Sequence, residues 1–295
     1  MKAKTILLYG RTRAGKSTQI GEMAEYVKTT TGKNTRLYTA DRGGIGPLLP
    51  YIDLGVVEVV AQQDTNPWIF MNQAARGRVR DIAGKWVDGD NSSIGMCAFE
   101  SMTSFADALM NDLAKQAGNN VNIGGAANVS FSVQGDNETL KISGNNMGHY
   151  NVVQSRITDE VWASQLLPVD YVLWTASVSK DADELSTSKV LGPQVVGKAL
   201  TTEVPRWFEL CFRIDAIPSQ AGKPERHILY LGNSVDQASG NAVSLGNTRT
   251  PLDSKPLPAS IEPASLVGAL KLINQTKVEA LEAIKKRMSV APPKG

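Results

Sequence analysis

Short apolar runs alternate with stretches of helical periodicity along most of the chain. Runs typical of buried β-strands lie at 5–9, 35–39, 56–60, 94–99 and 171–176. Apolar residues at helical spacing predict helices between them at 16–30, 67–86, 101–116 and 150–165. This alternation predicts an α/β fold, in which a mostly parallel sheet is covered by helices on both faces.

Two departures from the alternation predict additions to this core. The runs 207–214 and 226–231 have no helical stretch between them, which predicts an antiparallel extension at the edge of the sheet. Residues 118–148 are rich in glycine and asparagine and enclose two stretches of alternating residues. These stretches predict an inserted β-hairpin.

The composition of the chain changes after residue 231, so we expect three parts. Residues 1–231 form the predicted core. Residues 232–263 are rich in Gly, Asn, Ser and Pro, which predicts an irregular arm or linker. Residues 264–295 predict an amphipathic helix and a tail. The basic run 285–287 suits the last turn of a packing or solvating helix better than a dedicated nucleic-acid contact.

The first apolar run ends at Gly10, where the pattern G-x-x-x-x-G-K-S begins and continues to Ser17. A glycine-bearing turn between a strand and a helix points successive backbone N–H groups into one concavity, which suits a phosphate. Lys16 is then expected to reach the β- and γ-phosphates, and the Ser17 hydroxyl to bind Mg²⁺. The alternative is a glycine turn with a chance Lys-Ser pair, which the flanking strand and helix disfavour. The expected nucleotide-binding residues are Gly10, Arg11, Thr12, Arg13, Ala14, Gly15, Lys16, Ser17 and Thr18.

The apolar run 94–99 ends in an acidic residue, Glu100. A carboxylate at the end of a buried strand is costly unless it is paired or faces a cation. Glu100 is therefore a candidate to hold Mg²⁺ through water, together with Ser17, or to polarise an attacking water.

Charge and cysteine content narrow the class of protein only slightly. The chain has 31 Lys and Arg against 29 Asp and Glu, so any site for a polyanion or a membrane surface must be a local patch. Cys97 and Cys211 lie in apolar runs and predict two buried thiols in a reducing compartment. With two histidines in the chain, a zinc centre is not expected. No run of 18 apolar residues and no signal-peptide pattern occurs, so we expect a cytoplasmic protein without a membrane partner.

The order of these motifs resembles the RecA-like P-loop ATPases of bacteriophages, including the phage nucleotide-binding proteins grouped with single-strand annealing and recombination functions. The resemblance covers residues 4 to about 215, and only the phosphate loop is highly specific. It implies ATP and Mg²⁺ as cofactors, an ATPase activity, and a location in the host cytoplasm. The segments that carry it are "GRTRAGKST", "LYTADRGGIGPLLPYI", "CAFESMTSFADAL", "YVLWTAS" and "VVGKALTTEVPRWFELCFRID".

The sequence departs from this family at the position of the general base. In the family an acidic residue before paired glycines activates water, whereas here Arg42 stands at that place, directly after Asp41. Either Asp41 or Glu100 then takes the role of the base, or hydrolysis is slow and ATP acts mainly as a binding switch.

The resemblance also assigns two DNA-facing loops, at 118–148 and at 177–196. Single-strand binding needs several cations and stacking aromatic residues, and these segments offer Lys141, Lys180 and Lys189. The alternative is a surface hairpin and a flexible loop without a ligand.

RecA-like motors complete their active sites with a cation from a neighbouring subunit, which implies a homo-oligomer. Lys198, or else Arg206, is the candidate for that role, and the alternative is that both are surface charges. Two functions stay open. One is an oligomeric ATPase acting on single-stranded DNA in recombination or replication. The other is a nucleotide-gated protein of virion assembly or DNA packaging with little or no hydrolysis.

Overall fold

A computed structural model gives the fold of most of the chain. It describes residues 3–41, 43–63, 66–117, 128–132, 139–143, 147–182, 189–196, 198–219, 225–235, 242–248 and 256–289. Within this part of the chain, no helix combines the length and apolar character needed to cross a bilayer.

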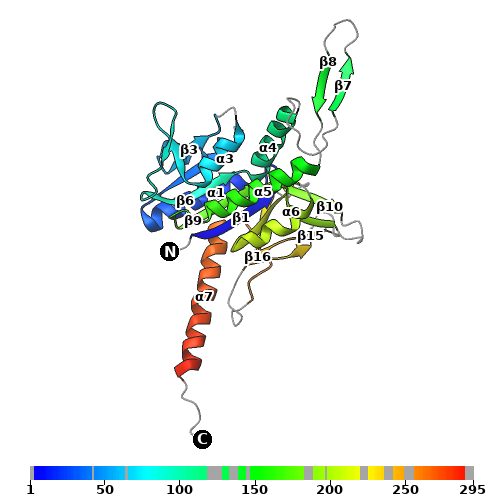
Figure 1. Ribbon diagram of the computed structural model, residues 1–295. Coiled ribbons are helices and arrows are strands. Elements are labelled where there is room, and N and C mark those ends of the chain that lie inside the picture. Colours follow the sequence, from blue (N-terminus) through cyan, green and yellow to red (C-terminus); the bar gives the residue numbers. More distant parts are fainter. Residues whose placement is uncertain are drawn as a thin grey trace.

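The centre of the molecule is a sheet with six parallel strands (Figure 1). In spatial order these are β12 (Leu210–Ile217), β1 (Lys4–Gly10), β9 (Tyr171–Ala176), β6 (Ile94–Glu100), β2 (Asn34–Thr39) and β3 (Val57–Ala61). At one edge, β13 (Arg226–Tyr230) and β17 (Ser260–Ile261) continue the sheet in antiparallel pairing, and β16 (Asn247–Thr248) pairs with β12. The mostly parallel sheet and its antiparallel edge were both predicted, and they confirm the α/β fold class.

Helices cover both faces of this sheet. The helices are α1 (Lys16–Thr31), α2 (Leu49–Asp53), α3 (Pro67–Ala75), α4 (Met102–Ala117), α5 (Met147–Ser164), α6 (Lys198–Glu203) and α7 (Leu266–Ser289), with 3-10 turns η1 (Gly46–Leu48) and η2 (Val204–Trp207). On one face, Leu7 and Tyr9 of β1 belong to the core that α3, α4 and α5 close. On the other face, Ile6 and Leu8 belong to the core that α1 and α7 close. Because β1 is buried on both faces, its sequence is a continuous apolar run.

A row of stacked rings crosses three adjacent strands in the first core. The ring of Tyr38 on β2 lies 5.2 Å from that of Phe99 on β6, which lies 4.4 Å from that of Trp174 on β9. All three side chains are buried. The stack therefore fixes β2, β6 and β9 relative to one another at the strand ends nearest the site described below.

The helix predicted at 67–86 is wrong in its second half. The helix α3 ends at Ala75, and an antiparallel pair of strands follows, β4 (Arg78–Arg80) and β5 (Trp86–Asp88). Gly77 has φ 72° and ends the helix, because this conformation suits glycine. In the turn of the hairpin, the Asp81 carboxylate accepts hydrogen bonds from the backbone N–H groups of Ala83 and Lys85. This local turn chemistry overrides the helical spacing of the apolar residues.

Two other segments are more regular than the sequence suggests. In the predicted loop 177–196, β10 (Val178–Ala182) and β11 (Lys189–Pro193) form an antiparallel pair. They belong to a second sheet with β15 (Ala242–Ser244) and β14 (Ser234–Val235). Residues 232–263 were expected to be irregular. They supply β14, β15, β16 and β17 instead, in strands of two or three residues. Strand β14 pairs with β15, and β15, β16 and β17 pair with β11, β12 and β13, which lie outside this segment.

The predicted hairpin at 118–148 is present in its paired part. The strands β7 (Asn128–Ser132) and β8 (Thr139–Ser143) are antiparallel, and the segments before, between and after them lie outside the described residues. Cys97 and Cys211 are buried free thiols, as expected, and burial raises the pKa of the Cys97 thiol to about 12.

The C-terminal helix α7 packs on α1 through its first half and extends away from the sheet (Figure 1). Leu270 and Ile273 are buried in the second core. The Gln19 side chain of α1 accepts a hydrogen bond from the backbone N–H of Leu266 and donates one to the carbonyl of Ala264.

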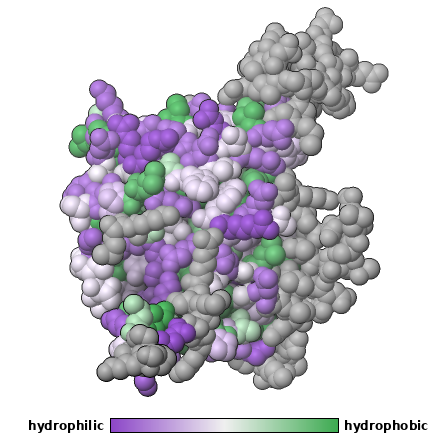
Figure 2. Space-filling view, turned by 60° about the horizontal axis from the view of Figure 1, so that its bottom comes forward, coloured by the Kyte–Doolittle hydropathy of each residue, from purple (hydrophilic) through white to green (hydrophobic). Residues whose placement is uncertain are grey.

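On the face that Figure 2 shows, hydrophilic residues predominate and hydrophobic ones are scattered among them.

Leu270→Ala is expected to lower the free energy of unfolding by about 2–5 kcal/mol, because it leaves a cavity between α7 and α1. The matched control is Leu281→Ala on the same helix, where the leucine is 51% exposed and the expected loss is about 0.5 kcal/mol or less. Urea denaturation of both variants measures the difference. Equal losses would show that α7 does not pack on the core as described.

Candidate phosphate-binding site

The loop between β1 and α1 has a backbone that only some residues can adopt. Arg13 has φ 64° and Gly15 has φ 97°, both in the left-handed region. At Gly10, a Cβ atom would collide with the carbonyl oxygen of Ile214 on the neighbouring strand β12. Gly15 is also the residue before α1, so the unpaired N–H groups of the first helical turn begin at the end of this loop.

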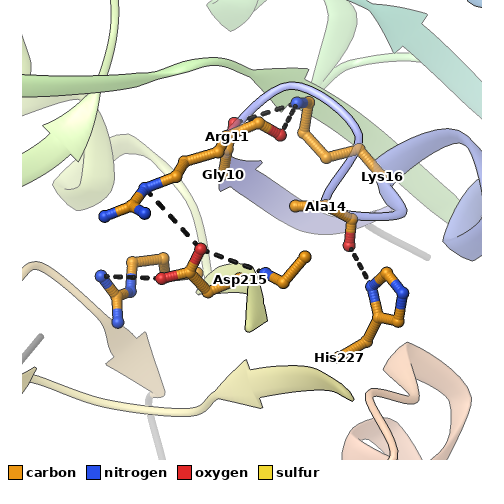
Figure 3. A network of polar contacts seen from close by, with 8 residues as sticks. Gly10, Arg11, Ala14, Lys16, Asp215 and His227 are labelled. Atoms are coloured by element: carbon orange, nitrogen blue, oxygen red, sulfur yellow. Dashed lines mark hydrogen bonds and ion pairs between the residues drawn. The ribbon is translucent and has the colours of Figure 1, made fainter. Parts of the chain in front are cut away.

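Lys16 is held by the loop itself (Figure 3). Its Nζ donates hydrogen bonds of 2.9 Å to the carbonyl oxygens of Gly10 and Arg11. Burial lowers the pKa of the Lys16 ammonium, while the charges of Glu100 and Asp41 act in the opposite direction. The ammonium group is thus placed inside the loop, beside two carboxylates.

Glu100 and Ser17 meet although they are 83 positions apart in the chain. The Ser17 hydroxyl donates a hydrogen bond of 2.5 Å to Oε1 of Glu100, whose residue is only 4% exposed. The other carboxylate oxygen, Oε2, is buried and has no hydrogen-bond partner in the described part of the chain. Burial raises the pKa of Glu100 most strongly. The Ser17 hydrogen bond lowers it, the charge of Asp41 raises it, and the charge of Lys16 lowers it.

These residues line one cavity of about 550 Å³. The loop, the start of α1, the end of β6 and the segment after β2 all contribute to its wall. Its lining residues are Thr12, Arg13, Gly15, Lys16, Ser17, Thr18, Asp41, Gly43, Gly44, Pro47, Glu100, Ser101, Ser104 and Ser177. Asp41 accepts a hydrogen bond of 2.9 Å from the backbone N–H of Gly43. A Cβ at Gly44 would lie 3.3 Å from the Glu100 carboxylate carbon, so a side chain at this position would crowd that carboxylate.

The donor set fits a magnesium ion that accompanies phosphate. Mg²⁺ prefers oxygen ligands, keeps several waters, and is usually held by one or two protein groups in addition to phosphate oxygens. Ser17 offers a hydroxyl, and the buried Oε2 of Glu100 offers an acceptor that no described residue binds. An ion or its water near this oxygen would satisfy it.

The cavity includes most of the predicted site residues. The exceptions within the loop are Gly10, Arg11 and Ala14, which contact β12, β13 or the Lys16 side chain instead. Lys198 begins α6, and its side chain lies outside the described residues, as does Arg42. The sequence reasoning missed Ser101, Ser104 and Ser177 as lining residues. Ser177 could have been found, because it directly follows the predicted strand 171–176.

A further set of hydrogen bonds connects the cavity wall to the second sheet. The Thr103 hydroxyl accepts a hydrogen bond of 2.9 Å from the backbone N–H of Ser177 and donates one of 2.7 Å to the carbonyl of Gln194. The backbone N–H of Gln194 donates to the carbonyl of Ser177. Thr103 thus ties together the two ends of the β10–β11 hairpin beside the cavity.

No protein-family model matches the chain, and no curated protein matches it. Solved structures similar to it include the following two. A KaiC-like protein from the hyperthermophilic archaeon Pyrococcus horikoshii is 10% identical, with a TM-score of 0.42 and coverage of 82% of this chain and 89% of its own. A RadB recombinase is 12% identical, with a TM-score of 0.43 and coverage of 83% and 91%. The chemistry of the site rests on the residues of this chain and not on these similarities.

Glu100→Gln is expected to raise the free energy of unfolding at neutral pH in the absence of nucleotide and divalent cations. Because the pKa of Glu100 is higher in the folded chain, ionisation of this carboxyl destabilises the fold as pH rises through the folded pKa. The higher stability of the variant should therefore disappear below about pH 4.5, the pKa of this carboxyl in the unfolded chain. Urea denaturation at several pH values measures it, with Glu25→Gln at an exposed site of α1 as the control. A less stable Gln variant at neutral pH would contradict the description of Glu100.

Proposed function

We propose that this chain binds ATP with Mg²⁺ in the cavity and hydrolyses it slowly. The observation that carries the proposal is the contact between Ser17 and Glu100. It brings a hydroxyl at the start of α1 and a buried carboxylate at the end of β6 to one cavity, beside the Lys16 ammonium. A glycine turn with a chance Lys-Ser pair gives no reason for a buried carboxylate at this place.

In this proposal the loop and Lys16 bind the triphosphate. The N–H groups at the start of α1 and the dipole of that helix favour negative charge. Lys16 would exchange its hydrogen bonds to the carbonyls of Gly10 and Arg11 for charge-assisted bonds to phosphate oxygens, which are the stronger ones. Ser17 and Glu100 would hold Mg²⁺, which would supply positive charge for the phosphate oxygens.

We assign separate roles to the two carboxylates of the cavity. Glu100, which Ser17 contacts at Oε1 and which has no partner at Oε2 in the described part of the chain, is the group for the metal and its water. Asp41 lies in the same cavity, and one of its oxygens is fixed by the N–H of Gly43, which leaves its other oxygen to accept a proton from the attacking water. Arg42 occupies the position at which the resembled family has its acidic general base, and in this proposal Asp41 takes the role of that base.

The hairpin β10–β11 supports a role in single-stranded DNA binding of the phage recombination type. It begins directly after Ser177 of the cavity wall, and Thr103 joins its two ends. Its strands contain Lys180 and Lys189, which would add positive charge for a nucleic-acid backbone. A homo-oligomer with Lys198 acting on the neighbouring subunit's nucleotide stays a prediction from the sequence.

Lys16→Ala is expected to weaken Mg–ATP binding about 10- to 100-fold, since a charge-assisted hydrogen-bonding group is lost. Titration calorimetry measures the affinity. The control is Lys85→Ala in the exposed turn between β4 and β5, which should bind as the wild type does. Unchanged affinity in the Lys16 variant would remove the phosphate-loop assignment.

Asp41→Asn and Glu100→Gln are each expected to slow hydrolysis about 100-fold or more while ATP stays bound, because the amide neither accepts a proton nor holds a metal-bound water. Phosphate release is measured with and without single-stranded DNA, which should accelerate the wild type. Wild-type rates in both variants would place the base elsewhere. Tight binding with negligible turnover in the wild type would favour the nucleotide-gated assembly protein.

A further inference from the structure

The phosphate loop is also contacted from behind, by the hairpin of β12 and β13 (Figure 3). Asp215 of β12 and His227 of β13 both point toward the loop, and neither residue lines the cavity. Neither residue belongs to the phosphate-loop pattern, and His227 lies 213 positions beyond the loop residue that it contacts.

His227 makes a hydrogen bond whose direction is settled by its partner. Its Nδ1 lies 3.1 Å from the carbonyl oxygen of Ala14. A carbonyl oxygen only accepts, so Nδ1 carries the hydrogen. Nε2 faces Glu225, whose Oε1 lies 3.9 Å away. The backbone of His227 is held on both sides. It pairs with Ala216 of β12, and the His227 carbonyl accepts a hydrogen bond from the backbone N–H of Ala264.

This hydrogen bond determines which way the next amide points. The peptide between Ala14 and Gly15 is trans, so its C=O and its N–H lie on opposite sides of the peptide unit. His227 binds the C=O from behind the loop, and the N–H of Gly15 therefore points toward the opposite side. Gly15 lines the cavity, and its φ of 97° permits this orientation.

Asp215 fixes the other end of the loop in a similar manner. Its Oδ1 lies 3.8 Å from Nε of Arg11 and accepts a hydrogen bond from the backbone N–H of Ala216, and its Oδ2 lies 3.8 Å from a guanidinium nitrogen of Arg213. The carbonyl of Arg11 in turn accepts the hydrogen bond from Lys16. The hairpin thus holds the loop at two places. One is Arg11, whose carbonyl binds Lys16, and the other is Ala14, which precedes Gly15.

We propose that His227 is a positioning residue for nucleotide binding: it orients the Ala14–Gly15 peptide so that the Gly15 N–H faces the phosphates before they bind. Asp215 supports the same arrangement through Arg11. This inference rests on the proposed function of the cavity. Because the oriented amide serves bound substrate and transition state alike, loss of the His227 hydrogen bond affects KM and leaves kcat nearly unchanged.

The test compares two substitutions of His227 that differ in the donor. In His227→Phe the ring shape is kept and the donor is lost, whereas in His227→Asn the side-chain amide nitrogen stands near the place of Nδ1 and donates. We expect the Phe variant to bind Mg–ATP about three- to tenfold more weakly, with a matching rise in KM, and the Asn variant to stay within about twofold of the wild type. Titration calorimetry, steady-state kinetics and urea denaturation are measured on all three proteins.

The outcomes separate this inference from the proposed function. Wild-type affinity in the Phe variant, or equal weakening in the Phe and Asn variants, would overturn the role of His227 while the site itself stands. Equal affinity of wild type and Lys16→Ala for Mg–ATP would overturn the proposed function, and the inference with it. A loss of unfolding free energy in the Phe variant without a loss of affinity would show that His227 only stabilises the fold, which also contradicts the proposal.

Discussion

The site depends on one costly constraint, a carboxylate buried at the end of a parallel strand. Glu100 is 4% exposed, and of its two oxygens only Oε1 has a hydrogen-bond partner among the described residues, the hydroxyl of Ser17. Burial of an ionised carboxylate is unfavourable unless a cation or hydrogen-bond donors compensate it. The strands β1, β9 and β6, the loop before α1 and the position of Lys16 all serve to bring compensating groups to this carboxylate.

The sheet gives this arrangement its rigidity. Strand β9 lies between β1 and β6, so the phosphate loop and Glu100 come from two strands that do not touch, and the cavity lies over their carboxyl ends. The ring stack from Tyr38 through Phe99 to Trp174 fixes the residue directly before Glu100. On the other side, the β12–β13 hairpin holds the loop itself at Arg11 and Ala14. The loop is therefore supported by structure on both sides of β1.

The sequence predicts the parts of this structure that depend on local pattern. The runs 5–9 and 94–99 are continuously apolar because their strands are buried on both faces. The phosphate-loop spacing predicted Lys16 and Ser17 as site residues, and the acidic end of the run 94–99 predicted Glu100 as a third. The second half of the helix predicted at 67–86 was wrong because Trp86 and its apolar neighbours occur at helical spacing by chance, while Gly77 and Asp81 decide the actual turn. The short strands within 232–263 could not be predicted, since strands of two or three residues are set by their partners. The contact of His227 with Ala14 has no local signal at all.

The coupling between Ser17 and Glu100 in magnesium-dependent nucleotide binding tests the central claim most directly. A double-mutant cycle measures this coupling from the ATP affinities of wild type, Ser17→Ala, Glu100→Gln and the double variant, each in the presence and absence of Mg²⁺. If the two groups hold one ion and its water, the losses in Mg²⁺-dependent affinity are not additive, and the double variant loses little more than the worse single variant. Additive losses, or an ATP affinity of the wild type that does not respond to Mg²⁺, would contradict the account.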